Sequence, residues 1–262
     1  MKLKRYFKLW LAFFRYSLQG MLEFRGELVF WTFNIFLWFG LGMITLDLIF
    51  GKINAIAGWT KPEAYLAFFI SVLFSDIFWA FFFPNLNNFS RLIRLGWLDH
   101  VLLKPVSPRF LISFKFIDFD HFLRMALAIF LIYRYTILVS GHLSLVNGLL
   151  FLLLFLCGIV IFYSFYFILT LTNIWFTNLS NLLGFFNDIK ELGVRPVYIF
   201  KAGWFYLFSF IIPVAYIATF PAEALMGKIS LIKIILAPAL AVLFFVLSEK
   251  FFRFALKHYT SA

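Results

Sequence analysis

The stretch LLFLLLFLCGIVIFYSFYFILTL, residues 149–171, decides the fold of this chain. It contains no charged side chain and no proline. A helix of this length rises about 34 Å at about 1.5 Å per residue, which is enough to cross a hydrocarbon core of about 30 Å. Cys157 within it is the single cysteine of the chain, so an intrachain disulfide is impossible. We therefore predict a transmembrane helix over 149–171.

The rest of the chain has the same apolar character. Of its 262 residues, 64% are hydrophobic and 13% are charged, whereas soluble domains have about 45–50% apolar and about 25% charged residues. The net charge of +11 would suggest nucleic acid as the partner of a soluble protein, but here the basic residues are spread between long apolar runs. The composition therefore predicts an all-α polytopic membrane protein that contacts lipid and no nucleic acid.

Five further hydrophobic regions are long enough to enter the membrane. The pattern is weakest in 122–139, because Arg124 and Arg134 lie within it and must reach an interface or face protein. The fifth region of the series contains Pro213 and Pro221, and proline lacks the backbone donor that a continuous helix needs. For that region we predict a half-span followed by a re-entrant segment, with a proline-kinked span as the alternative. The six predicted membrane segments are 28–50, 64–83, 122–139, 149–171, 204–225 and 231–247.

Residues 1–26 have the pattern of an amphipathic helix. Apolar side chains recur every three or four positions, and polar or basic side chains fall on the opposite face. We predict an interfacial helix that lies in the membrane plane; a basic segment that only sets the orientation of the chain is the alternative. The apolar face comprises Leu3, Phe7, Trp10, Phe14, Leu18 and Met21, and the other face Lys4, Lys8, Arg15 and Gln19.

The distribution of lysine and arginine predicts the orientation. With six crossings and the N-terminus inside, the inner segments hold 18 of the 23 basic residues and the outer segments hold 5. Positively charged loops remain in the cytoplasm. We therefore predict that both termini and the long connection 84–121 are cytoplasmic.

Asp76 is the best intramembrane candidate for a functional polar residue. A carboxylate at the centre of a spanning helix costs about 2.5–3.5 kcal/mol, so it should face protein or water. A hydrogen bond to a neighbouring helix or partner chain is the structural alternative to a functional role. Nearby in sequence, Asp120 and Arg124 have the i, i+4 spacing of a helical ion pair, which we favour over a proton relay.

The chain lacks the sequence motifs of several enzyme classes. Its Gly-Lys pairs, at Gly51 and Gly227, are followed by isoleucine and have no upstream glycine of a phosphate-binding loop. It contains no His-x-x-x-His pair, no Cys-x-x-Cys and no Gly-x-Ser-x-Gly elbow. We predict no catalytic residue, no metal site and no cofactor bound by this chain.

Two stretches carry a resemblance to a known family. The first is GWLDHVLLKPVSP at 96–108, and the second is RPVYIF at 195–200, which continues to FIIPVA at 210–215 and FPA at 220–222. They resemble permeases of the ABC-2 type, in the branch of uncharacterised bacterial export systems. The resemblance covers nearly the whole chain, because an interfacial helix, six spans and a long second cytoplasmic connection occur in the same order. It implies one transmembrane permease domain over 1–262.

In that family the connection between spans two and three docks on an ATP-binding subunit. The resemblance implies a cytoplasmic coupling helix at 92–103, stopped by the Lys-Pro-x-Ser-Pro sequence; a generic loop with helix-stopping prolines is the alternative. It also implies a re-entrant turn that caps the pathway from outside, with Pro213, Phe220 and Pro221 as its residues. The predicted coupling residues are Gly96, Leu98, Asp99, Leu102, Lys104, Pro105, Val106, Ser107 and Pro108.

The resemblance further implies a division of labour between subunits. This chain would form the translocation path in the bacterial cytoplasmic (inner) membrane, and two copies of an ATP-binding subunit would hold ATP and Mg²⁺. A second permease would complete the transporter, either a related but different chain or a second copy. Two other functions are considered: a proton-coupled secondary carrier that uses Asp76, and a lipid-modifying membrane enzyme. Scarce intramembrane charge argues against the carrier, and the missing catalytic cluster argues against the enzyme.

Overall fold

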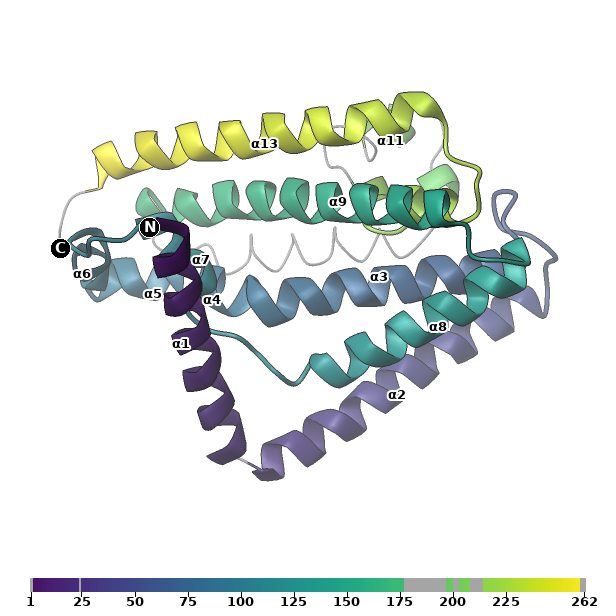
Figure 1. The fold of residues 1–262 in the computed structure, drawn as a ribbon, viewed down its shortest axis with the longest axis horizontal. Coiled ribbons are helices and arrows are strands. Elements are labelled where there is room, and N and C mark those ends of the chain that lie inside the picture. Colours follow the sequence, from purple (N-terminus) through teal and green to yellow (C-terminus); the bar gives the residue numbers. More distant parts are fainter. Residues whose placement is uncertain (1, 24, 177–196, 200–202, 208–213, 260–262) are drawn as a thin grey trace.

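The computed structural model describes residues 2–23, 25–176, 197–199, 203–207 and 214–259, and its regular elements there are helices. Five of these helices are long and apolar enough to cross a membrane. They confirm an all-helical polytopic protein and five of the six predicted membrane segments (Figure 1). The five are α2 Arg25–Phe50, α3 Lys61–Phe81, α8 Phe122–Ser140, α9 Leu145–Leu171 and α13 Leu231–His258.

Helix α3 forms the centre of the bundle. In its most apolar window 67% of the residues are buried, against 11% for α2. It packs along α8, and α9 packs along α13 (Figure 1). Phe74 and Phe78 of α3 meet the ring of Phe162 of α9 edge to face, at centroid distances of 5.5 and 5.3 Å. Such contacts use the ring quadrupole and fill the space between helices with rigid side chains, so the many phenylalanines serve as interhelical packing as well as lipid contacts.

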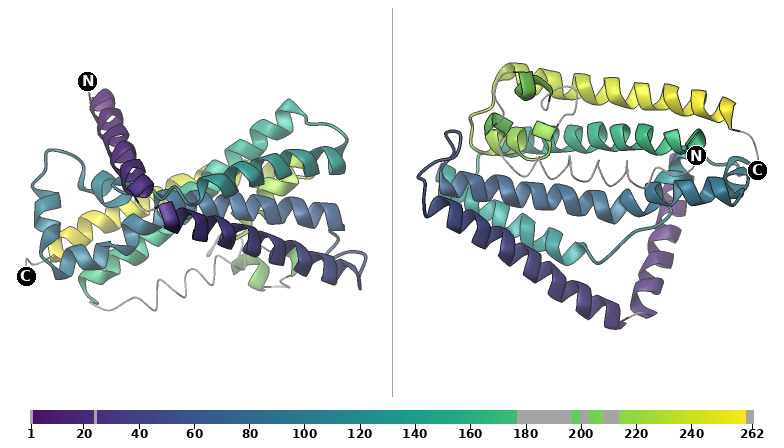
Figure 2. Two further views of the ribbon diagram at one scale, coloured as in Figure 1. Left: turned by 90° about the horizontal axis from the view of Figure 1, so that it is seen from below. Right: turned by 180° about the vertical axis from the view of Figure 1, so that it is seen from behind.

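Helix α1, Lys2–Glu23, lies across one end of the bundle instead of along it (Figures 1 and 2). Aromatic side chains of α1 pack against the segment that connects α3 to α8. The ring centroid of Tyr6 lies 5.0 Å from that of Phe110, and the ring centroid of Phe14 lies 4.9 Å from that of Phe119. Phe7 on the predicted apolar face remains 63% exposed. The amphipathic helix is therefore confirmed, while its position in the membrane plane stays a prediction.

The connection between α3 and α8 contains four short helices where one coupling helix, 92–103, was predicted. That prediction is wrong, because α5 ends at Arg94 and α6 begins at Trp97. Gly96 between them has φ +65°, the left-handed conformation that glycine adopts without steric cost and that interrupts a right-handed helix. The four helices are α4 Phe83–Asn87, α5 Phe89–Arg94, α6 Trp97–Leu102 and α7 Pro108–Phe114.

The predicted fifth membrane segment is described only in part. Pro213 lies outside the described residues, and so does the rest of 208–213. The described remainder contains α11 Gly203–Tyr206, η4 Val214–Tyr216 and α12 Thr219–Leu225. Residues 214–225 form a short apolar unit, and α12 is buried throughout against α9 and α3. At about 1.5 Å per residue it is too short to cross the hydrocarbon core.

Pro221 does not make the turn that was predicted for it. It is the third residue of α12, where the backbone N–H would have no intrahelical acceptor, so a proline there sacrifices no hydrogen bond. The chain reverses after α12 instead, at Met226 and Gly227, where Gly227 has φ +68°. Helix α13 then runs through the predicted end of the last span at 247 and includes the basic tail as far as His258.

Gly158 is the point of closest approach between α9 and the buried unit 214–225. A Cβ at this position would lie 2.5 Å from the carbonyl oxygen of Tyr216. We expect Gly158→Ala to lower the free energy of unfolding by about 1–3 kcal/mol, because η4 must shift away from α9. Gly148→Ala on the same helix is the control, since nothing lies within 4 Å of its Cβ position. Thermal melting of the detergent-solubilised variants measures the difference; equal melting temperatures would contradict this packing.

Candidate functional site

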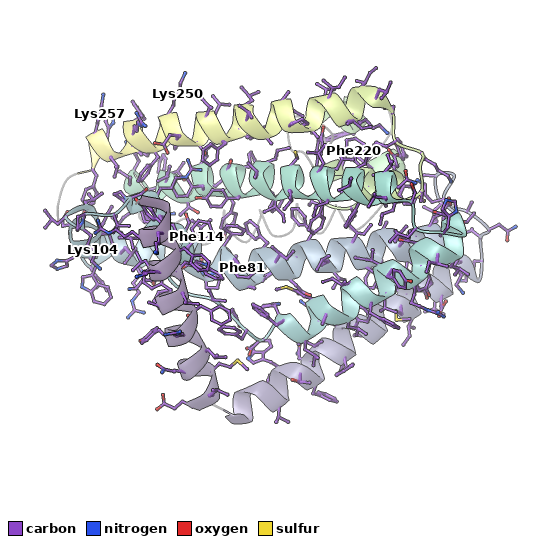
Figure 3. The ribbon with its side chains drawn as sticks, viewed as in Figure 1. Phe81, Lys104, Phe114, Phe220, Lys250 and Lys257 are labelled. Carbon is purple, nitrogen blue, oxygen red and sulfur yellow. The ribbon has the colours of Figure 1, made fainter. Side chains whose placement is uncertain are left out.

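The end of the molecule that carries α1 and α4 to α7, here called the basic end, presents an apolar surface with positive charge. Leu103 is 83% exposed, and Leu95 and Trp97 are each about half exposed. Lys104 projects from the same end, together with Lys250 and Lys257 of α13 (Figure 3). Large exposed apolar side chains next to basic ones are typical of a protein docking surface. The docking surface comprises Leu95, Trp97, His100, Leu103, Lys104 and Pro105.

Several predicted coupling residues have a structural role in building this end. Leu98 is fully buried and anchors α6 to the bundle. Asp99 lies beside the Tyr259 hydroxyl, and burial together with this carboxylate raises the pKa of Tyr259. The Ser107 N–H donates to Tyr6 Oη on α1 at 3.0 Å. Of the remaining predicted residues, Gly96 separates α5 from α6, Leu102 ends α6 and Pro108 begins α7. The turn between α6 and α7 contains the other three, Lys104, Pro105 and Val106.

The Lys-Pro-x-Ser-Pro sequence forms that turn as the pattern indicated. Helix α6 ends at Leu102, and the Val106 N–H donates to the Lys104 carbonyl oxygen at 2.8 Å. Ser107 precedes α7, and Pro108 is its first residue, the position at which proline's fixed φ suits a helix start. The exposed turn is therefore continuous with α7.

Arg109, the residue after Pro108, connects this end to two long helices. Its Nε–H donates to Tyr163 Oη on α9 at 3.2 Å. On α13, its Nη1 donates to Glu249 Oε2 at 3.1 Å and its Nη2 to Ser248 Oγ at 2.8 Å. The Arg109 side chain is only 10% exposed. Three directed bonds from one rigid guanidinium mean that α7 cannot tilt without moving α9 and α13 or breaking these bonds.

Aromatic rings enclose the same guanidinium. Its Cζ lies 4.3 Å from the ring centroid of Phe245 and 4.7 Å from that of Phe167. Tyr163, which accepts from Arg109, also shares a 2.7 Å hydrogen bond with Ser113 at the other end of α7. Cation–π contacts and a low local dielectric strengthen the charged hydrogen bonds. Arg109 and α7 are thus held to the bundle at two points.

Asp76, the predicted intramembrane candidate, is ion-paired. It is fully buried on α3, and Arg124 Nε of α8 donates to its two carboxylate oxygens at 2.8 and 2.9 Å. His121 Nδ1 lies 3.0 Å from Asp76 Oδ1, and the His121 ring stacks on Trp79. Asp120, the partner of Arg124 that sequence spacing favoured, lies in the turn before α8, and the Asp76 carboxylate that Arg124 bonds comes from the neighbouring helix α3. Asp76 thus makes the hydrogen bonds to a neighbouring helix that were the structural alternative to a functional role. The proton-carrier hypothesis depended on Asp76 and loses its main argument.

A second group of charges lies at the opposite end of the molecule, around α12. Lys233 Nζ donates to Glu223 Oε2 at 2.6 Å and to Tyr198 Oη at 2.5 Å, and Tyr198 donates to Glu223. Lys228 is paired with Glu63 at the start of α3. These bonds connect the buried unit 214–225 to α3 and α13, and Phe220 lies at this end (Figure 3). The predicted re-entrant residues Phe220 and Pro221 are therefore part of one buried, ion-paired assembly.

The ion pairs accentuate the charge asymmetry of the two ends. Lys61, Lys228 and Lys233 at the opposite end each have a carboxylate partner, at Asp47, Glu63 and Glu223. Toward the basic end, Arg109 and Arg253 share one carboxylate partner, Glu249. The surplus positive charge thus accumulates where the sequence placed the cytoplasmic segments. Figure 1 shows both ends of the chain at this same end of the bundle.

The described part of the chain contains no group of three or more His, Cys, Asp or Glu side chains that could hold a metal ion. Sequence reasoning also missed five residues of the site: Leu95, Trp97, His100, Leu103 and Arg109. Arg109 was counted only as a basic residue of the connection, although its position directly after the Lys-Pro-x-Ser-Pro sequence was a usable signal. Trp97 and Leu103 were not assigned, although large apolar residues in a polar connection are themselves unusual.

A bundle of membrane-length helices, with an exposed apolar and basic surface at one end and a buried, ion-paired unit at the other, is the architecture of a multi-pass membrane protein. The chain belongs to the ABC-2 family of transporter proteins, whose family model matches residues 36–262. It is therefore an ABC-2 type permease, the membrane component of an ABC transporter. No curated protein and no solved structure matches the chain.

Proposed function

We propose that this chain is the permease subunit of an ATP-driven ABC-2 exporter in a bacterial cytoplasmic membrane, with both termini and the basic end in the cytoplasm. The chain would form the translocation path as one permease domain over 1–262, while two copies of a separate subunit bind and hydrolyse ATP with Mg²⁺. The observation that carries this proposal is the continuity of the exposed turn 103–107 with α7, and of α7 with α9 and α13 through Arg109. Force applied to the turn thereby has a bonded route into the membrane helices.

The path would be completed by a second permease, which we expect to be a related but different chain, with a homodimer as the other arrangement. Helix α2 supports such a partner because nearly its whole length is exposed in the single chain. At the opposite end, the buried unit 214–225 would act as the re-entrant cap, held closed by the Glu223–Lys233 and Glu63–Lys228 pairs. Opening the path outward would require these pairs to separate.

Capture of the ATPase from native membranes tests the docking surface. We expect the double variant Leu103→Ser with Lys104→Glu to recover at least about 10-fold less ATP-binding subunit than the unaltered chain, because central apolar and charged interface residues each contribute about 1–2 kcal/mol or more. Lys250→Glu with Lys257→Glu, which reverses two charges at the same end outside the docking surface, is the matched control. The readout is the bound ATPase per permease after gentle crosslinking.

Equal capture by the double variant and the control would contradict the assignment of the docking surface. Failure of the unaltered chain to capture any ATP-binding subunit would contradict the proposed ATP-driven function itself. Reduced capture by the control variant alone would assign ATPase binding to α13 instead of to the turn 103–107.

A further inference from the structure

A polar pocket lies beside the short helices that connect α3 to α8. None of the residues in the hydrogen-bond network of Arg109 lines it. It has a volume of about 520 Å³. Five of its seven lining residues are polar or basic: two asparagines, a serine and two arginines. The lining residues are Pro84, Asn87, Asn88, Ser90, Arg91, Arg94 and Phe116.

The charge of this pocket is not neutralised by the protein. No carboxylate lines it, and among the described residues neither Arg91 nor Arg94 has a carboxylate within ion-pair distance, in contrast to Arg109, Arg124 and Arg253. Arg91 and Arg94 are also three positions apart on α5, where like charges repel. Arg91 is held over the ring of Trp97 at 5.7 Å, which orients the guanidinium without removing its charge. The pocket therefore favours an anion.

The backbone beside Phe116, a lining residue of the pocket, is fixed in place by hydrogen bonds. Asn85 Nδ2 donates to the carbonyl oxygens of Phe116 and Phe81 at 2.7 and 2.9 Å, and the Phe116 N–H donates to Asn85 Oδ1 at 2.7 Å. This clamp holds the segment that carries Phe116 against the end of α3. The part of the wall at Phe116 is thus preorganised, so binding requires little ordering of that part.

The donor set matches a phosphate group. Guanidinium groups bind phosphate oxygens through paired N–H donors, and amide and hydroxyl groups supply further donors to the remaining oxygens. Next to the pocket, the Ile117 N–H donates to Ser17 Oγ of α1 at 3.1 Å, so the pocket lies at the level of the amphipathic helix. That helix is expected at the membrane surface, where lipid headgroups provide phosphate at high local concentration.

We propose that this pocket binds the phosphate of an anionic lipid headgroup in the cytoplasmic leaflet. The bound lipid would neutralise Arg91 and Arg94 and attach the connection to the membrane surface beside the docking surface. This site does not depend on the ATP-driven function, because it requires only the permease chain and a bilayer.

Lipid retention by the purified full chain tests the site. The variant Arg91→Gln with Arg94→Gln is compared with Lys250→Gln with Lys257→Gln, which removes two exposed charges from the same end outside the pocket. Each protein is reconstituted in nanodiscs of phosphatidylcholine with 20% phosphatidylglycerol as a probe, and retained phosphatidylglycerol is counted by native mass spectrometry after detergent extraction. At about 1 kcal/mol for each basic residue near a lipid surface, we expect at least about 10-fold weaker retention by the pocket variant and little change in the control.

Three results would overturn the proposal. Equal retention of phosphatidylglycerol by both variants would mean that the pocket holds no lipid. Protection of the unaltered chain against thermal unfolding by millimolar inorganic phosphate, equal to that by short-chain phosphatidylglycerol, would assign the site to free phosphate. Unchanged lipid retention with loss of ATPase capture in the pocket variant would assign the arginines to an acidic surface of the partner protein.

Discussion

Replacing Arg109 with alanine is expected to uncouple the connection from the membrane helices and to destabilise the permease by about 2–4 kcal/mol. The variant loses three directed hydrogen bonds from one guanidinium, and a charged hydrogen bond contributes about 1.5–3 kcal/mol. The net loss is smaller than the sum of three such bonds, because Tyr163, Ser248 and Glu249 each keep another hydrogen-bond partner. The Glu249 side chain is 34% exposed, so solvent screening reduces the contribution of the Arg109–Glu249 bond to the free energy of unfolding. The free energy of unfolding in mixed micelles measures the stability effect.

Arg253→Ala is the matched control for this prediction. Arg253 also bonds Glu249, at 2.9 Å, but its side chain is 75% exposed and its removal is expected to cost less than about 1 kcal/mol. Similar losses in the two variants would contradict a special role for Arg109.

A separate measurement distinguishes coupling from stability. In the assembled complex, Arg109→Ala should retain the captured ATPase while losing the ATP-dependent change in distance between spin labels placed on α7 and α13. A charge exchange, Arg109→Glu with Glu249→Arg, should recover part of that change, because it restores an ion pair between the same two helices. A full ATP-dependent change in Arg109→Ala would show that force takes another route.

Removing the carboxylate of Asp76 is expected to cost about 3–5 kcal/mol, the largest stability effect among the charged residues. Asp76 is fully buried and Arg124 is only 19% exposed, so Asp76→Ala leaves a guanidinium without its counter-charge inside the bundle. The double variant Asp76→Asn with Arg124→Gln removes both charges and should recover most of the loss. Unfolding in mixed micelles again provides the measurement.

Asp47→Ala provides the comparison for an exposed pair. Asp47 bonds Lys61 at 2.7 Å, but both side chains are about half exposed, and such pairs contribute about 0–1 kcal/mol. A loss in Asp76→Ala no greater than in Asp47→Ala would show that water reaches the Asp76 site. A double variant as unstable as Asp76→Ala would show that the loss comes from packing instead of from the unpaired charge.

The membrane spans and one helix end could be predicted from the sequence alone. Run lengths correctly predicted α2, α3, α8, α9 and α13, because a bilayer imposes a minimum apolar length on any spanning helix. The Lys-Pro-x-Ser-Pro sequence correctly predicted the stop between α6 and α7, because proline has a fixed φ and no backbone donor. The fifth predicted membrane segment, 204–225, stays a prediction, since 208–213 lies outside the described residues.

Local details were less predictable where two conformations suit the same residue. Gly96 was read as part of a helix, yet it adopts positive φ and divides the predicted coupling helix into α5 and α6. Pro221 was read as a turn, yet it occupies the first turn of α12, where proline is equally well tolerated. In both cases the local sequence permits either outcome, and packing of the neighbouring segments selects one.

The sequence by itself determined that this protein is a helical membrane protein of several spans, because apolar length is a property of contiguous residues, and its short motifs carry the resemblance to the ABC-2 family that the family model shows. Only the tertiary structure decided which charges meet. Arg124 has Asp120 four positions before it in the sequence, and it bonds Asp76 of α3, 48 positions away; Arg109 bonds residues 54 and 140 positions away. Such pairs depend on the rotation and axial offset of packed helices. Those quantities are set by the fit of many side chains across an interface, and they leave no periodic mark in the sequence of either helix.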